Sequence, residues 1–363
     1  MINVLKIFKK EYQTLNKIEI SKKNLLSNYR YLSSLNRRVK IAPVIKSNAY
    51  GHGLIPIAKI LDKINAPFFC VDSLYEAYEL LKIGIKTKVL IMGYTDPENF
   101  KVKKLPFSYA VFNEEVLSIL DKYQPGCGIH IFVDTGMHRE GVPLQKLPQF
   151  LQEINKYPNL KIEGLMSHLA SADDKKDLLN KLQIKNFKRA LEICKEFGVK
   201  PKWIHLSNSD GLVNNIPGNI QNLSRTGLAL YGISSNPNLI HVLSFKSKII
   251  QIKKLEKEDR IGYSGTYTAK KPTVIGVLPV GYFDGVDMRL SNKGFVKINK
   301  ISCPIIGKVS MNITTLDISK ITNPYIGQEV TIYNSIKETA KICNTNPYDI
   351  LVHLSSSTKR III

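Results

Sequence analysis

Between about residue 17 and residue 230, the chain alternates short apolar runs with longer amphipathic runs. This alternation is typical of repeated βα units, in which parallel strands lie beneath helices. The apolar runs predict eight strands, at residues 41–45, 67–71, 88–92, 109–112, 129–133, 162–166, 203–206 and, more weakly, 222–224. A closed (β/α)8 barrel has eight strands and usually about 250 residues, slightly more than this span. We therefore expect a TIM-like barrel with short loops, and an open doubly wound sheet is the structural alternative.

Two of the expected helices carry clear end signals. Ser73 followed by Glu76 predicts a capping box at the start of one helix, which should end at Gly84. The longest helix is expected from about residue 175 to residue 197, because Gly198 follows it.

The pattern changes near Asn236 and Pro237. Segments 245–255, 273–282, 294–300 and 329–335 read as strands separated by Gly, Asn and Pro turns. We therefore predict a barrel domain at residues 14–236 and a mostly β domain at residues 237–363. Residues 1–13 are expected to pack on the second domain.

Composition excludes several classes of protein. The formal charge of +22 comes from 52 Lys and Arg against 30 Asp and Glu, but no block of five like charges occurs. A Lys-rich solvated surface is therefore expected, with no nucleic-acid partner. No run of eighteen apolar residues predicts a membrane span, and the start of the sequence lacks a signal-peptide pattern. The five cysteines lack metal-site spacing, so we expect free thiols, no metal and a cytoplasmic protein.

Lys46 is the first candidate for chemistry. Barrel enzymes place reactive groups after the C-terminal ends of strands, and Lys46 directly follows the first expected strand, in APVIKSNAYGHG. A lysine desolvated at such a position loses its proton more easily and can form an imine with a carbonyl. By itself, a lysine after a strand is more often a surface residue.

The surrounding motif favours the chemical role. PVIKSNAYGHG is similar to the cofactor-lysine signature of the alanine racemases, with matching residues at Lys46, Asn48, Ala49, Tyr50, Gly51 and Gly53. The resemblance continues from about Ile18 to the C-terminus. It implies a pyridoxal 5'-phosphate-dependent isomerase that interconverts L-alanine and D-alanine and supplies D-alanine for cell-wall peptidoglycan. It also implies a homodimer whose active sites are shared across the interface.

Other motifs of the resemblance imply roles at the barrel mouth. VDTGMHREG after the fifth strand resembles a motif that places Arg139 at the substrate carboxylate, which a guanidinium can bind in bidentate fashion. Taken alone, this arginine or a single histidine would more often be a solvated or structural residue. The implied cofactor contacts are Tyr50, His168, Asn208, Ser209, Arg225, Gly227 and Leu228. Among them, Arg225 faces the pyridine nitrogen, Ser209 and Tyr50 bind the phosphate, and His168 lies beneath the ring.

Racemisation requires a base on each face of the α-carbon. The resemblance implies Lys46 as one base and Tyr263, in RIGYSGTYTA of the other subunit, as the second. A free tyrosine titrates near pH 10, so a nearby cation must favour the phenolate, and Arg139 is a candidate. Met311 is implied as a substrate contact across the dimer interface, although core packing explains it equally well.

Three positions depart from the family pattern. Phe132 replaces a lysine whose carbamylated side chain often orients the motif arginine, Asn312 replaces a common aspartate, and Ser356 replaces a frequent tyrosine at the site entrance. These departures leave open a broader-specificity amino-acid racemase. A barrel decarboxylase of basic amino acids is a second alternative, although it should carry a carboxylate in place of Arg225. A single-barrel pyridoxal-phosphate carrier would leave the residues beyond 236 unexplained.

Overall fold

The computed structural model describes residues 13–363, and these residues form two compact units. One unit comprises Ser21–Leu243 with Ile362–Ile363, and the other comprises the described residues up to Ile20 with Ser244–Ile361. The predicted packing of residues 1–13 on the second domain concerns residues 1–12, which lie outside the described residues. The prediction of a barrel domain at residues 14–236 and a mostly β domain at residues 237–363, with this boundary, stays a prediction.

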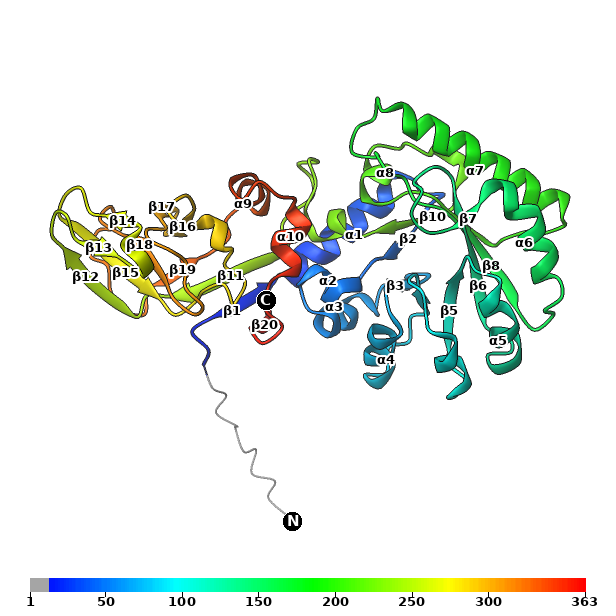
Figure 1. Cartoon of the computed structure of the whole chain (residues 1–363), viewed down its shortest axis with the longest axis horizontal. Helices are drawn as coiled ribbons and strands as arrows, with labels where there is room; N and C mark the ends of the chain where they lie inside the picture. Colours follow the sequence, from blue (N-terminus) through cyan, green and yellow to red (C-terminus); the bar gives the residue numbers. More distant parts are fainter. Residues whose placement is uncertain (1–12) are drawn as a thin grey trace, which may run out of the picture. The chain divides into compact units, whose positions relative to one another are not determined.

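Eight parallel strands form the centre of the first unit (Figure 1). They are β2 (Lys40–Pro43), β3 (Phe69–Val71), β4 (Val89–Ile91), β5 (Phe107–Val111), β6 (Gly128–Asp134), β8 (Lys161–Met166), β9 (Trp203–His205) and β10 (Leu223–Thr226). Strands β3 to β9 pair in one sheet, and β10 pairs with β2 in another. A parallel bridge between Val44 and Cys70 and a 3.0 Å hydrogen bond from Asn222 N to Ile204 O join the two sheets. The predicted barrel and its eight strands are confirmed.

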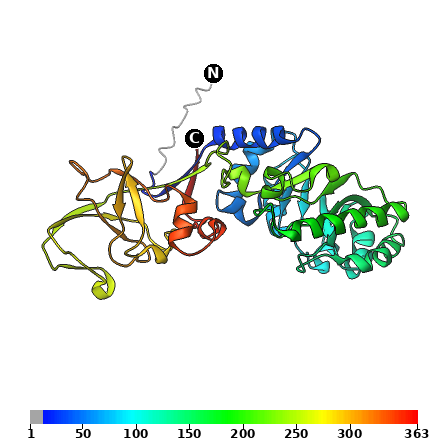
Figure 2. The ribbon, with the colours of Figure 1, turned by 90° about the horizontal axis from the view of Figure 1, so that it is seen from above.

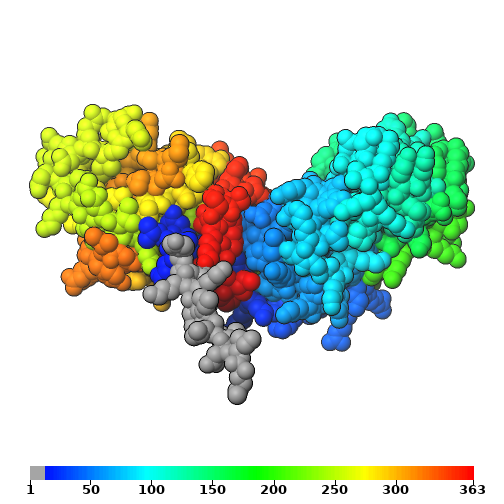
Figure 3. Space-filling view, turned by 90° about the horizontal axis from the view of Figure 1, so that it is seen from below, coloured from blue at the N-terminus to red at the C-terminus, as the bar shows by residue number. Residues whose placement is uncertain are grey.

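Helices cover the outside of these strands (Figure 2). They are α1 (Lys22–Leu35), α3 (Leu54–Leu61), α4 (Leu74–Lys82), α5 (Glu115–Tyr123), α6 (Leu147–Ile154) and α7 (Leu178–Glu196), and the shorter elements are α2 (Lys46–Tyr50), α8 (Ser209–Val213), β7 (Val142–Pro143), η1 (Pro97–Lys101), η2 (Leu144–Lys146), η3 (Gly218–Ile220) and η4 (Leu228–Tyr231). In Figure 3, the blue-to-cyan atoms of the first unit lie together on the side that is shown. Helix α7 is the predicted longest helix, but it begins three residues later than expected because the Asp177 side chain caps the N–H of Leu179.

The capping box predicted at Ser73 is only half formed. The Ser73 hydroxyl accepts a 3.3 Å hydrogen bond from Glu76 N, as expected for an N-cap. The Glu76 carboxylate instead accepts from the backbone N–H groups of Asp72, at 3.0 Å, and Asn48, at 3.2 Å. Glu76 therefore links helix α4 to the loop after β2.

The second unit is built mainly from antiparallel strands, as predicted from residues 245–335. A six-stranded sheet has the order β17-β16-β19-β11-β1-β20, beside a three-stranded sheet β12-β15-β18 and a β13-β14 hairpin. The bounds are β1 (Lys17–Ile20), β11 (Leu243–Lys248), β12 (Gln251–Leu255), β13 (Arg260–Ile261), β14 (Tyr267–Thr268), β15 (Thr273–Leu278), β16 (Phe295–Ile298), β17 (Ile301–Pro304), β18 (Thr314–Asp317), β19 (Glu329–Thr331) and β20 (Lys359–Ile362). Helices α9 (Ile336–Ile342) and α10 (Pro347–Val352) and turns η5 (Tyr263–Gly265) and η6 (Met288–Leu290) complete it.

Several expectations from composition concern the whole chain. All five cysteines are free, as predicted, and all five are buried. Within residues 13–363, no helix is both long and apolar enough to cross a bilayer. The same residues contain no cluster of three His, Cys, Asp or Glu side chains arranged to hold a metal ion.

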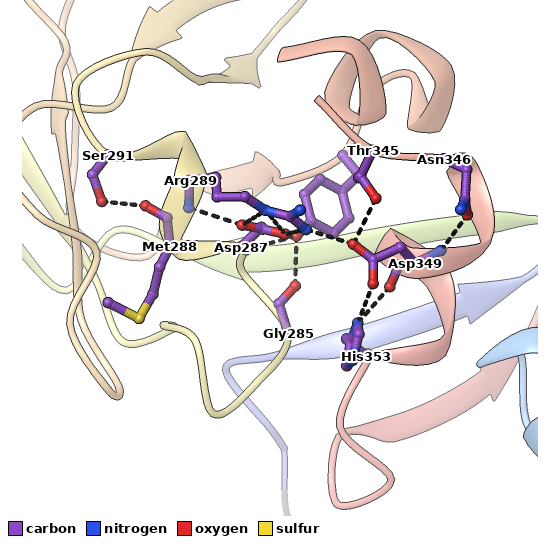
Figure 4. A network of polar contacts seen from close by, with 10 residues as sticks. Gly285, Asp287, Met288, Arg289, Ser291, Thr345, Asn346, Asp349 and His353 are labelled. Atoms are coloured by element: carbon purple, nitrogen blue, oxygen red, sulfur yellow. Dashed lines mark hydrogen bonds and ion pairs between the residues drawn. The ribbon is translucent and has the colours of Figure 1, made fainter. Parts of the chain in front are cut away.

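A charged network centred on Arg289 joins η6 to α10 (Figure 4). Its guanidinium pairs with both Asp287 and Asp349, at 2.5 Å each, and Asp349 also accepts from the Thr345 hydroxyl at 2.9 Å. Burial opposes the charged form of Asp287, but the hydrogen bonds from Arg289 outweigh it and lower the pKa of that carboxyl. The hydrogen bond from Arg289, helped by Thr345, also lowers the pKa of Asp349.

We expect Arg289→Met to destabilise the protein by about 1 kcal/mol at pH 7, because the pairs are partly solvent-exposed. A lowered carboxyl pKa stabilises the fold above the unfolded pKa of about 4 and loses this effect as pH falls through the folded value. Urea unfolding of the variant should therefore depend less on pH below about pH 4 than that of the parent. Arg189→Met is the matched control, because Arg189 also pairs with two carboxylates, within α7. An equal loss in both variants would contradict a special role for the Arg289 network.

Candidate functional site at the barrel mouth

The loop after β2 has an unusual backbone. Ser47, Asn48, Ala49 and Tyr50 all have φ angles of 51° to 54°, so the segment labelled α2 is a left-handed turn. This conformation costs L-residues roughly 1–2 kcal/mol each. The turn directs Lys46 toward Asp72, and the Lys46 Nζ lies 2.8 Å from Asp72 Oδ1. The Lys46 side chain is 35% exposed, so the expected desolvation is only partial in this structure.

Hydrogen bonds to Asn48 hold the left-handed turn in place. The Asn48 N–H donates to the buried carboxylate of Glu76, and the Asn48 side chain accepts from Leu54 N at 2.8 Å. The Asn48 carbonyl accepts from Gly53 N at 2.9 Å. These contacts come from the chain directly after the turn and from α4, so they oppose relaxation of the strained backbone.

We expect Glu76→Ala to destabilise the protein by about 3 kcal/mol, because two backbone N–H groups would lose their acceptor. The strained turn should relax, and affinity for the cofactor that the sequence resemblance implies should fall with it. Urea unfolding and a fluorescence titration with pyridoxal phosphate measure the two effects. Glu79→Ala is the control, since Glu79 lies on the same helix and its carboxylate pairs with exposed Lys82. A Glu76→Ala protein as stable as Glu79→Ala would refute the buttressing role.

A cradle of hydrogen-bond donors follows β9 and β10. The Ser209 hydroxyl accepts from the N–H groups of Gly227, at 3.1 Å, and Ala229, at 3.2 Å. A Cβ atom on Gly227 would lie 2.6 Å from the Tyr50 hydroxyl, so only glycine allows this close approach. Ser209, Gly227 and Tyr50 are therefore brought together, and Ala229 is an additional donor that the sequence prediction missed.

The other two predicted cradle residues have different surroundings. Leu228 is buried, and Gly227 and Ala229 on either side of it provide the converging N–H groups. The Asn208 side chain caps α8 by accepting from Gly211 N at 2.9 Å, and its amide donates to Leu169 O at 3.3 Å. Its contacts in this structure thus position the helix that begins with Ser209.

Arg225 lies in β10, buried inside the barrel with 3% of its surface exposed. Its Nη1 donates to His205 Nδ1 and to His205 O, both at 2.9 Å, and its Nη2 donates to Ser167 O and to His168 Nδ1 at 3.2 Å. Burial lowers the pKa of Arg225 to about 10, which leaves the guanidinium charged at neutral pH.

His168 is a neutral imidazole beside this cation. Burial, followed by the charges of Arg225, Arg139 and Lys46, lowers its pKa to about 3. All three cations thus act on one ring, which places the predicted residues that follow β2, β6 and β8, and the one in β10, around a common region.

Arg139 follows β6 in a loop organised by Asp134. The Asp134 carboxylate accepts from the backbone N–H groups of Gly136, Met137 and His138. The Arg139 side chain is 54% exposed and forms a two-point pair with Glu140, with Nη2 at 2.9 Å from Oε1. It is therefore available at the surface of the barrel unit and carries its own counter-ion.

Tyr263 and Met311 belong to the other unit. Tyr263 lies at the tip of the β13-β14 hairpin and is 70% exposed. Arg260 holds this tip by donating to the carbonyls of Ser264 and Gly265. Met311 is 56% exposed, and its carbonyl accepts from Phe283 N at 3.0 Å. Core packing, the alternative explanation for Met311, therefore does not apply to its side chain in this structure.

Comparison with known proteins identifies the family. Residues 20–235 match the alanine racemase N-terminal domain, and residues 242–362 match the alanine racemase C-terminal domain. This chain belongs to the alanine racemase family. An alanine racemase from Fusobacterium nucleatum is 35% identical over 95% of this chain and 99% of its own length. An alanine racemase from Syntrophobacter fumaroxidans is 34% identical over 92% of this chain and 93% of its own length.

Solved alanine racemases share the whole fold. The enzyme from Bacillus anthracis with bound L-Ala-P superposes with a TM-score of 0.89 at 30% identity, covering 97% of this chain and 96% of that one. The enzyme from Clostridium difficile gives a TM-score of 0.90 at 27% identity, with 97% of each chain covered.

The three departures from the racemase pattern have distinct surroundings. Phe132 is buried and packs with Phe112, Ala110 and Met166, so this position contributes apolar packing in place of a charged group. Asn312 and Ser356 are both exposed in the second unit. The sequence alone also gave no reason to select Asp72, Glu76 or Ala229 as functional neighbours, because their roles depend on contacts between separate βα units.

Proposed function

We propose that this racemase holds pyridoxal 5'-phosphate at the barrel mouth through Lys46. Lys46 and Tyr263 are the two bases that invert the configuration of alanine at its α-carbon. The convergence of an amine, a donor cradle and a buried guanidinium at the C-terminal ends of the strands carries this proposal. This is the end of a barrel at which enzymes of this fold place their active sites. When bound, the cofactor supplies an electron sink for the α-carbon of the amino acid.

The residues present fit this cofactor. The Lys46 amine can form the covalent linkage, and Ser209, Tyr50 and the N–H groups of Gly227 and Ala229 can bind a phosphate. Asn208 would position this cradle, and Leu228 would line it. Arg225 would face the ring nitrogen, with His168 beneath the ring. An arginine only donates hydrogen bonds, so it would leave that nitrogen unprotonated and limit the electron sink. A weaker sink suits racemisation, in which rapid return of the proton suppresses side reactions.

The substrate carboxylate would bind to Arg139, and Met311 would contact the substrate from the other subunit. Lys46 would remove or return the α-proton on one face of the substrate. Tyr263, supplied by the other subunit, would do so on the opposite face, which is what inversion requires. Arg260 would hold the hairpin tip that presents the phenol.

A homodimer is part of this proposal. Tyr282, Phe283, Met288 and Met311 form a patch of exposed apolar side chains on the second unit, with exposures between 41% and 56%. Hydrogen bonds from Tyr282 N to Ser310 O and from Phe283 N to Met311 O join its two segments. Apolar patches of this kind often mark protein interfaces.

We expect Phe283→Asp to convert the dimer to single chains and to lower alanine racemisation with it, because a buried, unpaired carboxylate opposes association. Sedimentation velocity and a racemisation assay measure the two effects on the same sample. Tyr325→Asp is the control, since Tyr325 is also an exposed aromatic of the second unit but lies outside the patch. A fully active, monomeric Phe283→Asp protein would contradict the shared active site.

The cellular setting and substrate range extend the proposal. The free, buried state of all five cysteines supports a reducing cytoplasm as the compartment. Ser356, where relatives often have a tyrosine, supports acceptance of amino acids larger than alanine as a second candidate function.

A chiral assay with added pyridoxal phosphate tests both functions. We expect conversion of L-alanine to D-alanine and the reverse, with slower turnover of serine or lysine. Strict alanine preference would remove the broader function. Release of carbon dioxide from lysine or ornithine without racemisation would overturn the racemase proposal in favour of a decarboxylase.

A further inference from the structure

A row of polar side chains crosses the interior of the barrel, starting at Arg225. The Arg225 Nη1 lies 2.9 Å from His205 Nδ1, and His205 Nε2 lies 2.8 Å from His130 Nδ1. His130 Nε2 in turn lies 3.8 Å from Glu163 Oε2. Both imidazoles are fully buried, whereas 22% of the Glu163 side chain is exposed. The row therefore connects the guanidinium at the barrel mouth to a carboxylate near the barrel surface.

The arginine fixes the direction of every hydrogen bond in this row. A guanidinium can only donate, so His205 Nδ1 must accept and the His205 proton must lie on Nε2. His205 Nε2 then donates to His130 Nδ1, which places the His130 proton on its own Nε2. That N–H faces Glu163, and among the described residues it has no closer hydrogen-bond acceptor.

The charges along the row are also defined. Burial lowers the pKa of His205 and of His130, so both rings are neutral at pH 7. The facing His130 imidazole lowers the pKa of Glu163 to about 2, helped by the Ser108 hydroxyl, which donates to Oε2 at 2.8 Å, and by Lys88. The row thus has a cation at one end, a carboxylate at the other and two neutral, polarisable rings between them.

Few other ionisable groups act on this row. Cys70, Arg139 and the neutral His168 lie near the Arg225 end. At the other end, Cys127 lies near Glu163, and Lys88 Nζ pairs with Glu163 Oε1 at 3.2 Å. Burial raises the pKa of both thiols to about 12, so they remain uncharged. The charge pattern of the row should therefore stay constant across neutral pH.

Two glycines make room for the row. A Cβ atom on Gly164 would lie 2.1 Å from His130 Nδ1, and a Cβ atom on Gly128 would lie 2.2 Å from Glu163 Oε2. Any larger residue would push the imidazole or the carboxylate from its place. The adjacent strands β6 and β8 therefore provide space for the two groups farthest from Arg225.

We propose that Glu163 is the counter-ion of Arg225, acting through His130 and His205, and that it sets the charge and orientation of this guanidinium. These three are positioning residues, because they act on the cofactor only through Arg225. The effect of Glu163 on the bound cofactor rests on the proposed function. The arrangement of protons in the row does not depend on that function.

Nitrogen-15 NMR of the histidine side chains tests the arrangement directly. The full-length chain, with and without cofactor, contains seven histidines, and single substitutions at 130, 168 and 205 assign the three signals. We expect His130, His168 and His205 to be neutral with the proton on Nε2 from pH 6 to pH 8. An Nδ1–H tautomer or an imidazolium at His130 or His205 would overturn the proposal. This result is independent of whether the protein racemises alanine.

Glu163→Gln tests the link to the cofactor. The amide keeps the shape and an acceptor oxygen but removes the negative charge. We expect the midpoint of the pH titration of the bound cofactor's absorbance to fall by about half a pH unit, because loss of a nearby anion disfavours protonated forms. Glu153→Gln is the control, since Glu153 pairs with Lys156 and Tyr157 on the outer surface. A midpoint that does not move relative to this control, or that rises, would contradict the counter-ion role.

The two experiments separate the possible failures. Failure of the parent protein to bind pyridoxal phosphate would count against the proposed function, while the NMR result would still decide the proton arrangement. If Glu163→Gln fails to fold, the tautomers of the parent protein remain the deciding measurement.

Discussion

Lys46→Ala should lower the catalytic efficiency of alanine racemisation by at least about a thousandfold, because the substitution removes both the covalent anchor and one base. Cofactor should then bind only through the phosphate cradle and Arg225, with much weaker affinity. The assay is chiral chromatography of product from each enantiomer, together with the absorbance of protein after removal of free cofactor. The variant should unfold like the parent, since the Lys46 amine pairs with the exposed carboxylate of Asp72, and such exposed ion pairs contribute little to stability.

Lys59→Ala provides the control for this experiment. Lys59 is an exposed lysine of α3, close to Lys46 in sequence but on the outer surface. Its replacement should change neither turnover nor the cofactor absorbance. If the Lys46 variant retained parental turnover, the role of this amine in the chemistry would have to be abandoned.

Tyr263→Phe should lower racemisation by about 100-fold to 10,000-fold, the usual contribution of a general base. Because L-alanine and D-alanine have equal free energies, the catalytic efficiency must fall equally in both directions. Exchange of the α-proton with solvent should behave differently. The enantiomer that Lys46 deprotonates should still exchange in heavy water, whereas the other enantiomer should not.

Two observations support this experiment on the phenol. Tyr263 is 70% exposed, so removal of its hydroxyl should leave stability unchanged. Tyr267→Phe, in β14 of the same hairpin, is the matched control and should racemise alanine normally. Parental rates in Tyr263→Phe, or loss of exchange from both enantiomers, would exclude the two-base assignment.

The sequence predicted the barrel because hydrophobic periodicity is a local signal. Every expected strand from β2 to β10 is present, and Lys46, His168 and Ser209 follow strands as expected. The motif also predicted Gly227. A glycine is required there because a Cβ atom would collide with the Tyr50 hydroxyl.

The remaining features depend on contacts that local patterns do not encode. Glu76 looked like half of a capping box, but its carboxylate binds Asn48 N, 28 residues away in sequence. Similarly, His130 and His205 are 75 residues apart and meet only because β6 and β9 face the same barrel interior. Their hydrogen bond follows from strand register, which a single sequence does not provide.

Reduction of the cofactor-loaded protein with borohydride tests the central claim most directly. Borohydride makes the linkage between cofactor and protein permanent, and mass spectrometry of the digested protein then locates it. We predict a single phosphopyridoxyl group on Lys46, and its absence when borohydride is omitted. A group attached to another lysine, or none at all in a protein that racemises alanine, would contradict the account.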